Sequence, residues 1–75
     1  MVKLVPIKSK KLLKLLLKLG FIERDAEGSH VFLRHIDGRT TTVPMHRKEL
    51  SKGLLRKILN DVKLSKEEYD ELRKR

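Results

Sequence analysis

The chain has 75 residues, which suits one small domain near the lower size limit for a chain that folds alone. It contains no cysteine, which excludes a disulfide framework and thiolate chemistry, and no apolar run approaches the roughly 20 residues that span a bilayer. Nineteen Lys and Arg oppose ten Asp and Glu, so the net charge is +9. The start of the chain lacks the long apolar stretch and small-residue cleavage site of a signal peptide, so we expect a single cytoplasmic domain over residues 1–75.

The positive charge is concentrated at the start of the chain. Residues 1–20 contain six lysines and no acidic residue, whereas residues 65–75 contain four side chains of each sign. A basic excess on one segment is typical of proteins that bind a polyanion, most often nucleic acid. The alternative is a highly charged surface that favours stability in a hot habitat, since Lys and Glu abound and Gln is absent. The two interpretations are compatible.

The first predicted element is a helix with Ser9 as its N-cap and Gly20 at its end, where a left-handed residue is favoured. Its apolar stripe, with helical spacing, is Leu12, Leu15, Leu16 and Leu19. The opposite side carries Lys11, Lys14 and Lys18. These lysines either contact a polyanion or only solvate a surface helix.

The middle of the chain changes to the patterns of strands and tight turns. The predicted strands cover residues 21–25, 30–35 and 40–43. The first turn, residues 26–28, ends in Gly28, and Asp37-Gly38 is a strong hairpin signal for the second. Pro44 should stop the third strand. The segment therefore predicts an antiparallel meander of three strands.

Helical spacing returns in the last third of the chain. A second helix is predicted behind a cap at Ser51, with an apolar stripe of Leu55, Ile58, Leu59 and Val62. Ser65 and Glu68 form a capping-box pattern that opens a last helix, in which Tyr69 and Leu72 are the apolar contacts.

The order α-β-β-β-α-α predicts an α+β fold in which the helices pack on one face of a three-stranded antiparallel sheet. We expect the following residues to be buried: Leu12, Leu16, Ile22, Val43, Leu55 and Leu59. The first five of these elements, in the order α-β-β-β-α, follow the order of the double-stranded-RNA-binding domain. Of the three aromatic residues, two should lie in the core, which makes base stacking a poor route to RNA binding.

Three histidines are the only candidates for acid–base chemistry near neutral pH. His30 follows Gly28-Ser29 at the start of the second predicted strand, where it can serve as a general acid or base, although a noncatalytic surface histidine is the more frequent case. We interpret His35 as a solvated turn residue. His46 lies in a basic loop suited to contact with phosphate. Their spacings match no standard zinc site, so no metal is expected.

Six short motifs in order resemble the HicA toxin family over about residues 9–72. They are Leu19-Gly20-Phe21, Gly28-Ser29-His30, Arg34-His35-x-Asp37-Gly38-Arg39, Val43-Pro44-x-His46, the stretch from Lys48-Glu49-Leu50 to Ile58-Leu59, and Leu64-Ser65-x-Glu67-Glu68. The chain departs from the usual pattern at three positions, where Ile36 replaces Pro, and Arg47 and Lys63 each replace Gly.

The resemblance implies an mRNA-cleaving toxin with a double-stranded-RNA-binding-like fold, one essential histidine and a HicB antitoxin as partner. By this resemblance His30 is the catalytic residue, supported by the turn at Gly28 and Ser29. RNA carries its own nucleophile, the 2′-hydroxyl, so we expect metal-independent cleavage without a cofactor. The candidates for binding RNA are Arg34, Arg39, Arg47, Lys48, Lys11 and Lys14.

Two alternatives remain open at this point. A noncatalytic double-stranded-RNA-binding module would use the same basic surface but would not require His30. An antitoxin-like or structural partner protein is the third option, and the positive charge and the absence of an acidic, flexible tail argue against it.

Overall fold

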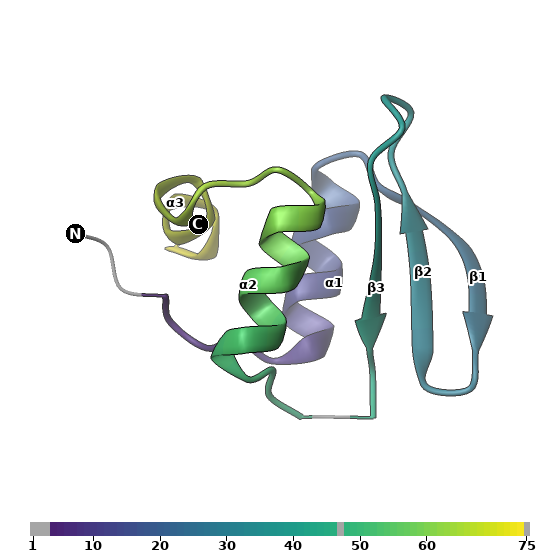
Figure 1. Ribbon diagram of the computed structural model, residues 1–75, viewed down its shortest axis with the longest axis horizontal. Helices are drawn as coiled ribbons and strands as arrows, with labels where there is room; N and C mark the ends of the chain where they lie inside the picture. The colour runs from purple at the N-terminus through teal and green to yellow at the C-terminus, as the bar shows by residue number, and fades with distance from the viewer. Residues whose placement is uncertain (1–3, 47, 75) are drawn as a thin grey trace.

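The computed structural model of the chain describes residues 4–46 and 48–74 (Figure 1). The elements, in chain order, are α1 (Ser9–Lys18), β1 (Ile22–Glu27), β2 (His30–Arg34), β3 (Thr40–Pro44), α2 (Lys52–Asp61) and α3 (Lys66–Lys74). The predicted order and the α+β class are confirmed. None of the described helices has the length and apolar character needed to cross a membrane.

The sheet is an antiparallel meander in the order β1-β2-β3. Its first turn is shorter than predicted, because β1 continues to Glu27, which pairs directly with His30. Only Gly28 and Ser29 remain as the loop, and Gly28 has a φ of +61°. A positive φ at the first of two loop residues is what a type II′ hairpin turn requires, and glycine adopts it without strain.

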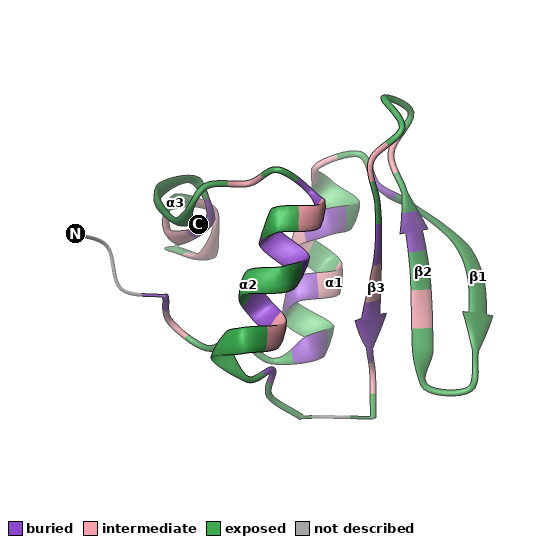
Figure 2. Ribbon diagram, viewed as in Figure 1, coloured by how far each residue is buried: buried purple, intermediate pink, exposed green. Residues whose placement is uncertain are grey.

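All three helices lie on the same side of the sheet (Figure 1). Helices α1 and α2 both contact β3, with α2 in front of α1 in this view, while α3 lies farther out, beside the segment that precedes α1. The core forms between the helices and the inner face of β2 and β3 (Figure 2). Phe21 and Tyr69 are the two aromatic residues in this core. Five of the six predicted core residues are buried: Leu12, Leu16, Val43, Leu55 and Leu59.

The sixth prediction was wrong, because Ile22 is 58% exposed. Ile22 pairs with Arg34 on the face of the sheet that no described helix covers, and Phe21, one residue earlier, occupies the core instead. Every residue of β1 is exposed, since the helix layer covers β2 and β3 but does not reach this edge strand (Figure 2).

The predicted helix ends are confirmed with one exception. Lys8, not Ser9, occupies the N-cap position of α1 and makes no side-chain cap; Ser9 is the first helical residue and is buried. Its backbone N–H donates to the carbonyl of Lys48 at 3.2 Å, so a long-range contact satisfies the donor there. The Ser51 hydroxyl accepts from the N–H of Leu54 at 3.2 Å, as predicted.

Candidate functional site

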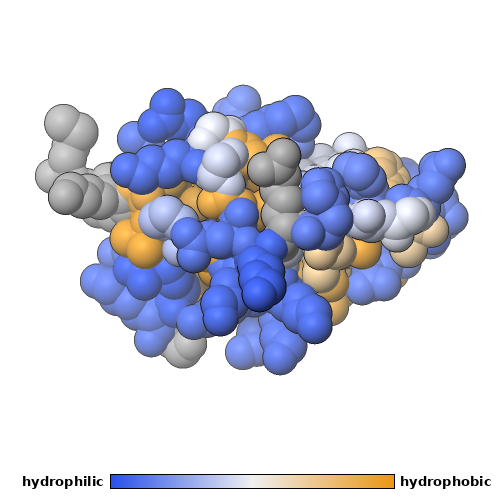
Figure 3. Space-filling view, turned by 90° about the horizontal axis from the view of Figure 1, so that it is seen from below, coloured by the Kyte–Doolittle hydropathy of each residue, from blue (hydrophilic) through white to orange (hydrophobic). Residues whose placement is uncertain are grey.

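One end of the molecule gathers the first hairpin turn, the loop after β3 and the N-terminal ends of α1 and α2 (Figure 1). The opposite end holds the second hairpin turn and the C-terminal ends of the same two helices. Seen from the first end, hydrophilic side chains cover much of the surface (Figure 3). The N-terminal ends of α1 and α2 carry the partial positive charge of the helix dipole, which favours an anion here. We call this the His30 end.

His30 is exposed and is held in place by strand pairing on both sides. It begins β2, the central strand, where it pairs with Glu27 of β1 and Pro44 of β3. The Ser29 carbonyl accepts a hydrogen bond from the N–H of Met45 at 2.5 Å, which ties the hairpin turn to the chain that leaves β3. The turn at Gly28 and Ser29 therefore positions the chain after β3 as well as His30.

That tie brings His46 beside His30. The two ring centroids lie 5.6 Å apart, with the ring planes inclined by 56°. Both side chains are exposed. Neither ring is hydrogen-bonded to any residue within the described ranges, so both are open to a ligand. The site thus contains two imidazoles that are close enough to contact the same ligand.

Lysines from two distant segments lie beside His46. A pocket of about 330 Å³ is lined by Lys8, Lys10, Met45, His46 and Lys48. The segments meet because Lys8 bridges to Glu49 in β fashion and the N–H of Leu50 donates to the carbonyl of Ile7 at 3.0 Å. Of these lysines, only Lys48 was a candidate from the sequence. Lys8 and Lys10 belong to the basic excess of residues 1–20, but only a long-range pairing shows that they lie at the site.

His35 lies at the opposite end of the sheet. The interpretation of His35 as a solvated turn residue was wrong, because its ring is partly buried and bonded. Its Nε2 lies 3.2 Å from the carbonyl oxygen of Leu19, and its Nδ1 lies 3.0 Å from a carboxylate oxygen of Asp37. Its ring also meets Phe21 edge-on, with 5.0 Å between centroids. This histidine joins the second hairpin turn to the end of α1.

Arg39 is occupied at the same far end. It pairs with Asp37 at 2.8 Å, donates to the carbonyl of Val62 at 2.6 Å, and lies 5.2 Å from the ring centroid of Phe21. Backbone and side-chain contacts with Arg39, led by its N–H bond, lower the pKa of Asp37 below its ordinary value despite some desolvation. The guanidinium thus has structural partners remote from His30.

The other predicted RNA-binding residues are spread over the surface. Arg34 is exposed at the far end of β2, about 13 Å of strand from His30. Lys11 and Lys14 lie on the exposed side of α1, progressively farther from the His30 end. Arg47 lies outside the described residues. Of the five candidates that the structure describes, only Lys48 lines the pocket beside the histidines.

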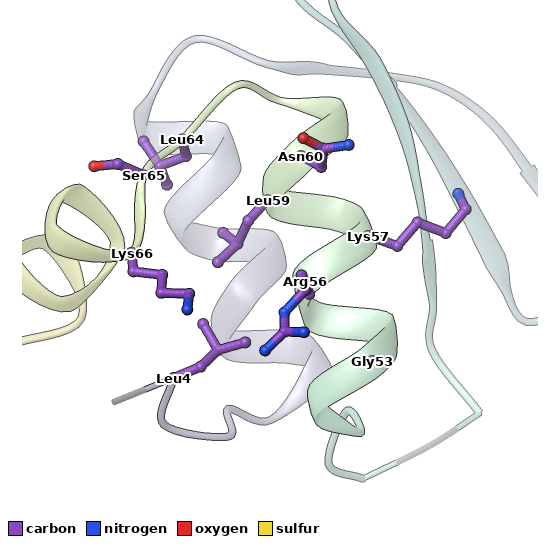
Figure 4. Close-up of a pocket in the computed structure, with 9 residues that line it drawn as sticks. All are labelled: Leu4, Gly53, Arg56, Lys57, Leu59, Asn60, Leu64, Ser65 and Lys66. Carbon is purple, nitrogen blue, oxygen red and sulfur yellow. The ribbon is translucent and has the colours of Figure 1, made fainter. Parts of the chain in front are cut away.

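A larger cavity, of about 680 Å³, lies elsewhere, between α2, the start of α3 and Leu4 (Figure 4). Leu4, Leu59 and Leu64 supply its apolar part, and Arg56 and Lys66 extend over it from the two helices. The described residues that line it include no histidine and no carboxylate, so it offers no group for proton transfer near neutral pH. Nor do the described residues contain a cluster of three or more His, Asp or Glu side chains suited to a metal ion.

The fold and the site together define a small α+β domain of the double-stranded-RNA-binding type with a basic, histidine-bearing end. The sequence matches the family described as HicA toxin of bacterial toxin-antitoxin over residues 9–64, and the chain belongs to that family. It is therefore a toxin of a toxin–antitoxin pair, with an antitoxin as partner. No curated protein matches the chain closely enough to add to this assignment.

Proposed function

We propose that this toxin is an endoribonuclease that cleaves mRNA and so inhibits translation. The observation that supports this most directly is an exposed histidine, His30, fixed by strand pairing beside a lysine-lined pocket. Lysines of this kind bind the phosphates of an RNA backbone, and an imidazole transfers protons near neutral pH. The whole chain acts as one domain in this proposal.

The chemistry requires little more than these groups. The 2′-hydroxyl of RNA attacks the adjacent phosphorus once its proton is removed, and the bond to the 5′-oxygen breaks. His30 transfers a proton in this step, and neighbouring cations stabilise the charge that develops on the phosphoryl oxygens. The resident nucleophile makes a metal-bound hydroxide unnecessary, so we propose metal-independent cleavage.

Phosphate binding divides between two groups of basic residues. Lys48, together with Lys8 and Lys10, would hold the phosphates nearest His30. Lys11 and Lys14, on the exposed side of α1, would contact RNA farther along its backbone. Arg34, Arg39 and Arg47 stay predictions from the sequence; the bonds of Arg39 to Asp37 and Val62 favour a structural role for that residue.

The antitoxin in this proposal is a HicB-like protein that covers His30 and the surrounding basic surface, which excludes RNA sterically. A domain with a net charge of +9 favours an acidic partner, and complementary charge speeds the encounter.

A direct experiment separates this function from the noncatalytic alternative. The purified protein is incubated with a long transcript in the presence of EDTA, and the transcript length is followed beside a binding assay. The proposal predicts shortened RNA. Binding at full transcript length would instead indicate a double-stranded-RNA-binding module.

A further inference from the structure

We propose that His46 is a second catalytic residue that works as a pair with His30. The inference rests on the proposed ribonuclease activity and deepens it. It comes from the ring geometry: 5.6 Å between centroids, an inclination of 56°, and two exposed rings without a hydrogen bond to any described residue.

Cleavage by the 2′-hydroxyl needs two proton transfers. One imidazole takes the 2′-hydroxyl proton as the oxygen–phosphorus bond forms, and the other, as imidazolium, gives a proton to the departing 5′-oxygen. The products are a 2′,3′-cyclic phosphate and a 5′-hydroxyl end, and the two rings have exchanged protonation states. Return of a proton from one ring to the other through water restores the starting state, so no co-reactant is needed.

The distance suits this division of work. A general acid or base acts at about 3 Å from its oxygen, and the entering and leaving oxygens lie on opposite sides of one phosphorus atom. Two rings 5.6 Å apart can each reach one of these oxygens on a phosphate that lies between them and solvent. The lysines of the adjacent pocket, Lys8, Lys10 and Lys48, bind the same phosphate through their positive charge. They therefore supply charge, and the histidines move the protons.

One carboxylate competes for the role of proton acceptor. Glu27 lies opposite His30 across the first hairpin and faces the same side of the sheet. The Glu27→Gln variant removes its basicity and keeps its shape, so it serves as the matched control. Our proposal predicts that this variant cleaves RNA at close to the wild-type rate.

The experiment compares two RNA substrates that differ in one atom, the bridging 5′-oxygen or a sulfur in its place. A thiolate leaves without protonation, because thiols are far more acidic than alcohols. Loss of the general acid is therefore rescued by sulfur, whereas loss of the base or of the fold is not. On the oxygen substrate, His30→Ala and His46→Ala should each lose about 10²-fold or more in single-turnover rate. On the sulfur substrate, one of the two variants, and only one, should return to near the wild-type rate.

Thermal melts verify that His30→Ala and His46→Ala are folded. His46→Asn, which keeps a polar side chain, is melted and assayed beside them. A His46→Ala protein that cleaves the oxygen substrate within about threefold of the wild-type rate would overturn the pair while leaving the proposed ribonuclease intact. So would a rescue of neither variant, or a large loss in Glu27→Gln. An inactive wild-type protein would instead overturn the proposed function, and the pair with it.

Discussion

His35 and Arg39 hold the second hairpin turn against the ends of two helices. His35 reaches the carbonyl of Leu19 at the end of α1, and Arg39 reaches the carbonyl of Val62 at the end of α2. Gly20 makes room for this arrangement, since a Cβ there would lie 3.1 Å from Nε2 of His35. These residues stabilise the fold at the end of the molecule that is remote from His30.

The first prediction concerns His35→Ala. The change removes hydrogen bonds to a half-buried ring and its contact with Phe21, so it should lower the free energy of unfolding by about 1–2 kcal/mol. The folded variant should still cleave RNA, because His35 lies far from His30. Chemical denaturation and a cleavage assay at low temperature measure the two effects. Ile36→Ala, at a 95% exposed neighbour, is the control and should change neither; a His35→Ala protein as stable as wild type but inactive would contradict the assignment.

At the scale of elements, helices α1 and α2 end in the same motif, but with a different left-handed residue in each. The N–H of Phe21 donates to the carbonyl of Leu16, and the N–H of Leu64 donates to the carbonyl of Leu59, each closing a Schellman turn. The left-handed residue is Gly20 in α1, with φ +100°, and Lys63 in α2, with φ +56°. Lys63 is the only non-glycine residue with a positive φ in the described chain, and it stands where the HicA pattern usually has glycine.

The second prediction follows from this strained lysine. Lys63→Gly should raise the free energy of unfolding by about 1 kcal/mol, because glycine adopts a left-handed conformation without the steric cost that lysine pays. The matched control is Lys57→Gly inside α2, which should lower it by about the same amount. Urea denaturation of the three proteins provides the measurement. A Lys63→Gly protein less stable than wild type would show that the lysine side chain has a compensating role.

The third prediction concerns acid and the start of α3. Glu68 accepts the N–H of Ser65 at 3.0 Å, and the Ser65 hydroxyl accepts the N–H of Glu68 at 3.0 Å, as the predicted capping box requires. These bonds lower the pKa of Glu68 below its ordinary value of 4.5, and the bond from the Ser65 backbone N–H has the largest effect. A carboxyl group with a lowered folded-state pKa stabilises the fold above its unfolded pKa and loses that contribution as the pH falls.

Melting temperatures should therefore fall as the pH drops below about 4.5, and the fall should be smaller in Glu68→Gln, which cannot gain a proton. Asp37 and Asp70, whose pKa values are also lowered, keep part of the acid sensitivity in that variant. Glu67→Gln, at a neighbouring exposed position, serves as the control. Identical pH profiles for the wild type and Glu68→Gln would contradict the role of the box.

Most elements could be predicted because local patterns specify them. Leucine spacing defined the helices, and Asp37-Gly38 and Ser65–Glu68 defined turn chemistry that acts over three or four residues. The failures arise where a distant element decides the outcome. Ile22 has the residue type of a core position, but β1 extends past the edge of the helix layer. Ser9 has the residue type of a cap, but the segment around Lys48 satisfies the backbone at that helix start.

At the scale of the whole molecule, the two ends of the sheet carry different kinds of residues and contacts. The far end carries hydrogen-bonded and ion-paired residues, while the His30 end carries exposed histidines and lysines. His30 and Lys48 could be named as candidate site residues from the sequence. The contribution of Lys8 and Lys10, and the closeness of His46 to His30, depend on pairings between segments far apart in the chain and could not be.

The fourth prediction tests which end the antitoxin covers. Lys8→Glu and Lys48→Glu should each slow association with the antitoxin, and the difference from wild type should shrink at high salt as the charges are screened. Lys57→Glu, an equal charge change on α2, should have a smaller effect because it lies outside the pocket beside the histidines. Stopped-flow association rates at two salt concentrations measure this. A structure of the complex with His30 open to solvent would contradict the proposed steric block.

The measurement that tests the central claim most directly is RNA cleavage and RNA binding by His30→Ala, in EDTA, on one defined RNA. Cleavage should fall by about 10²–10⁴-fold or more, because a proton-transfer group is lost. The fold should persist since His30 is exposed, and affinity should change little, because binding comes mainly from lysine and arginine contacts with phosphate. Lys48→Ala is the comparison, and it should weaken binding and reduce the log–log salt slope by roughly 0.7 on single strands. Near-normal cleavage by His30→Ala would contradict the mechanism, and an equal loss of binding and cleavage would make His30 a contact residue instead.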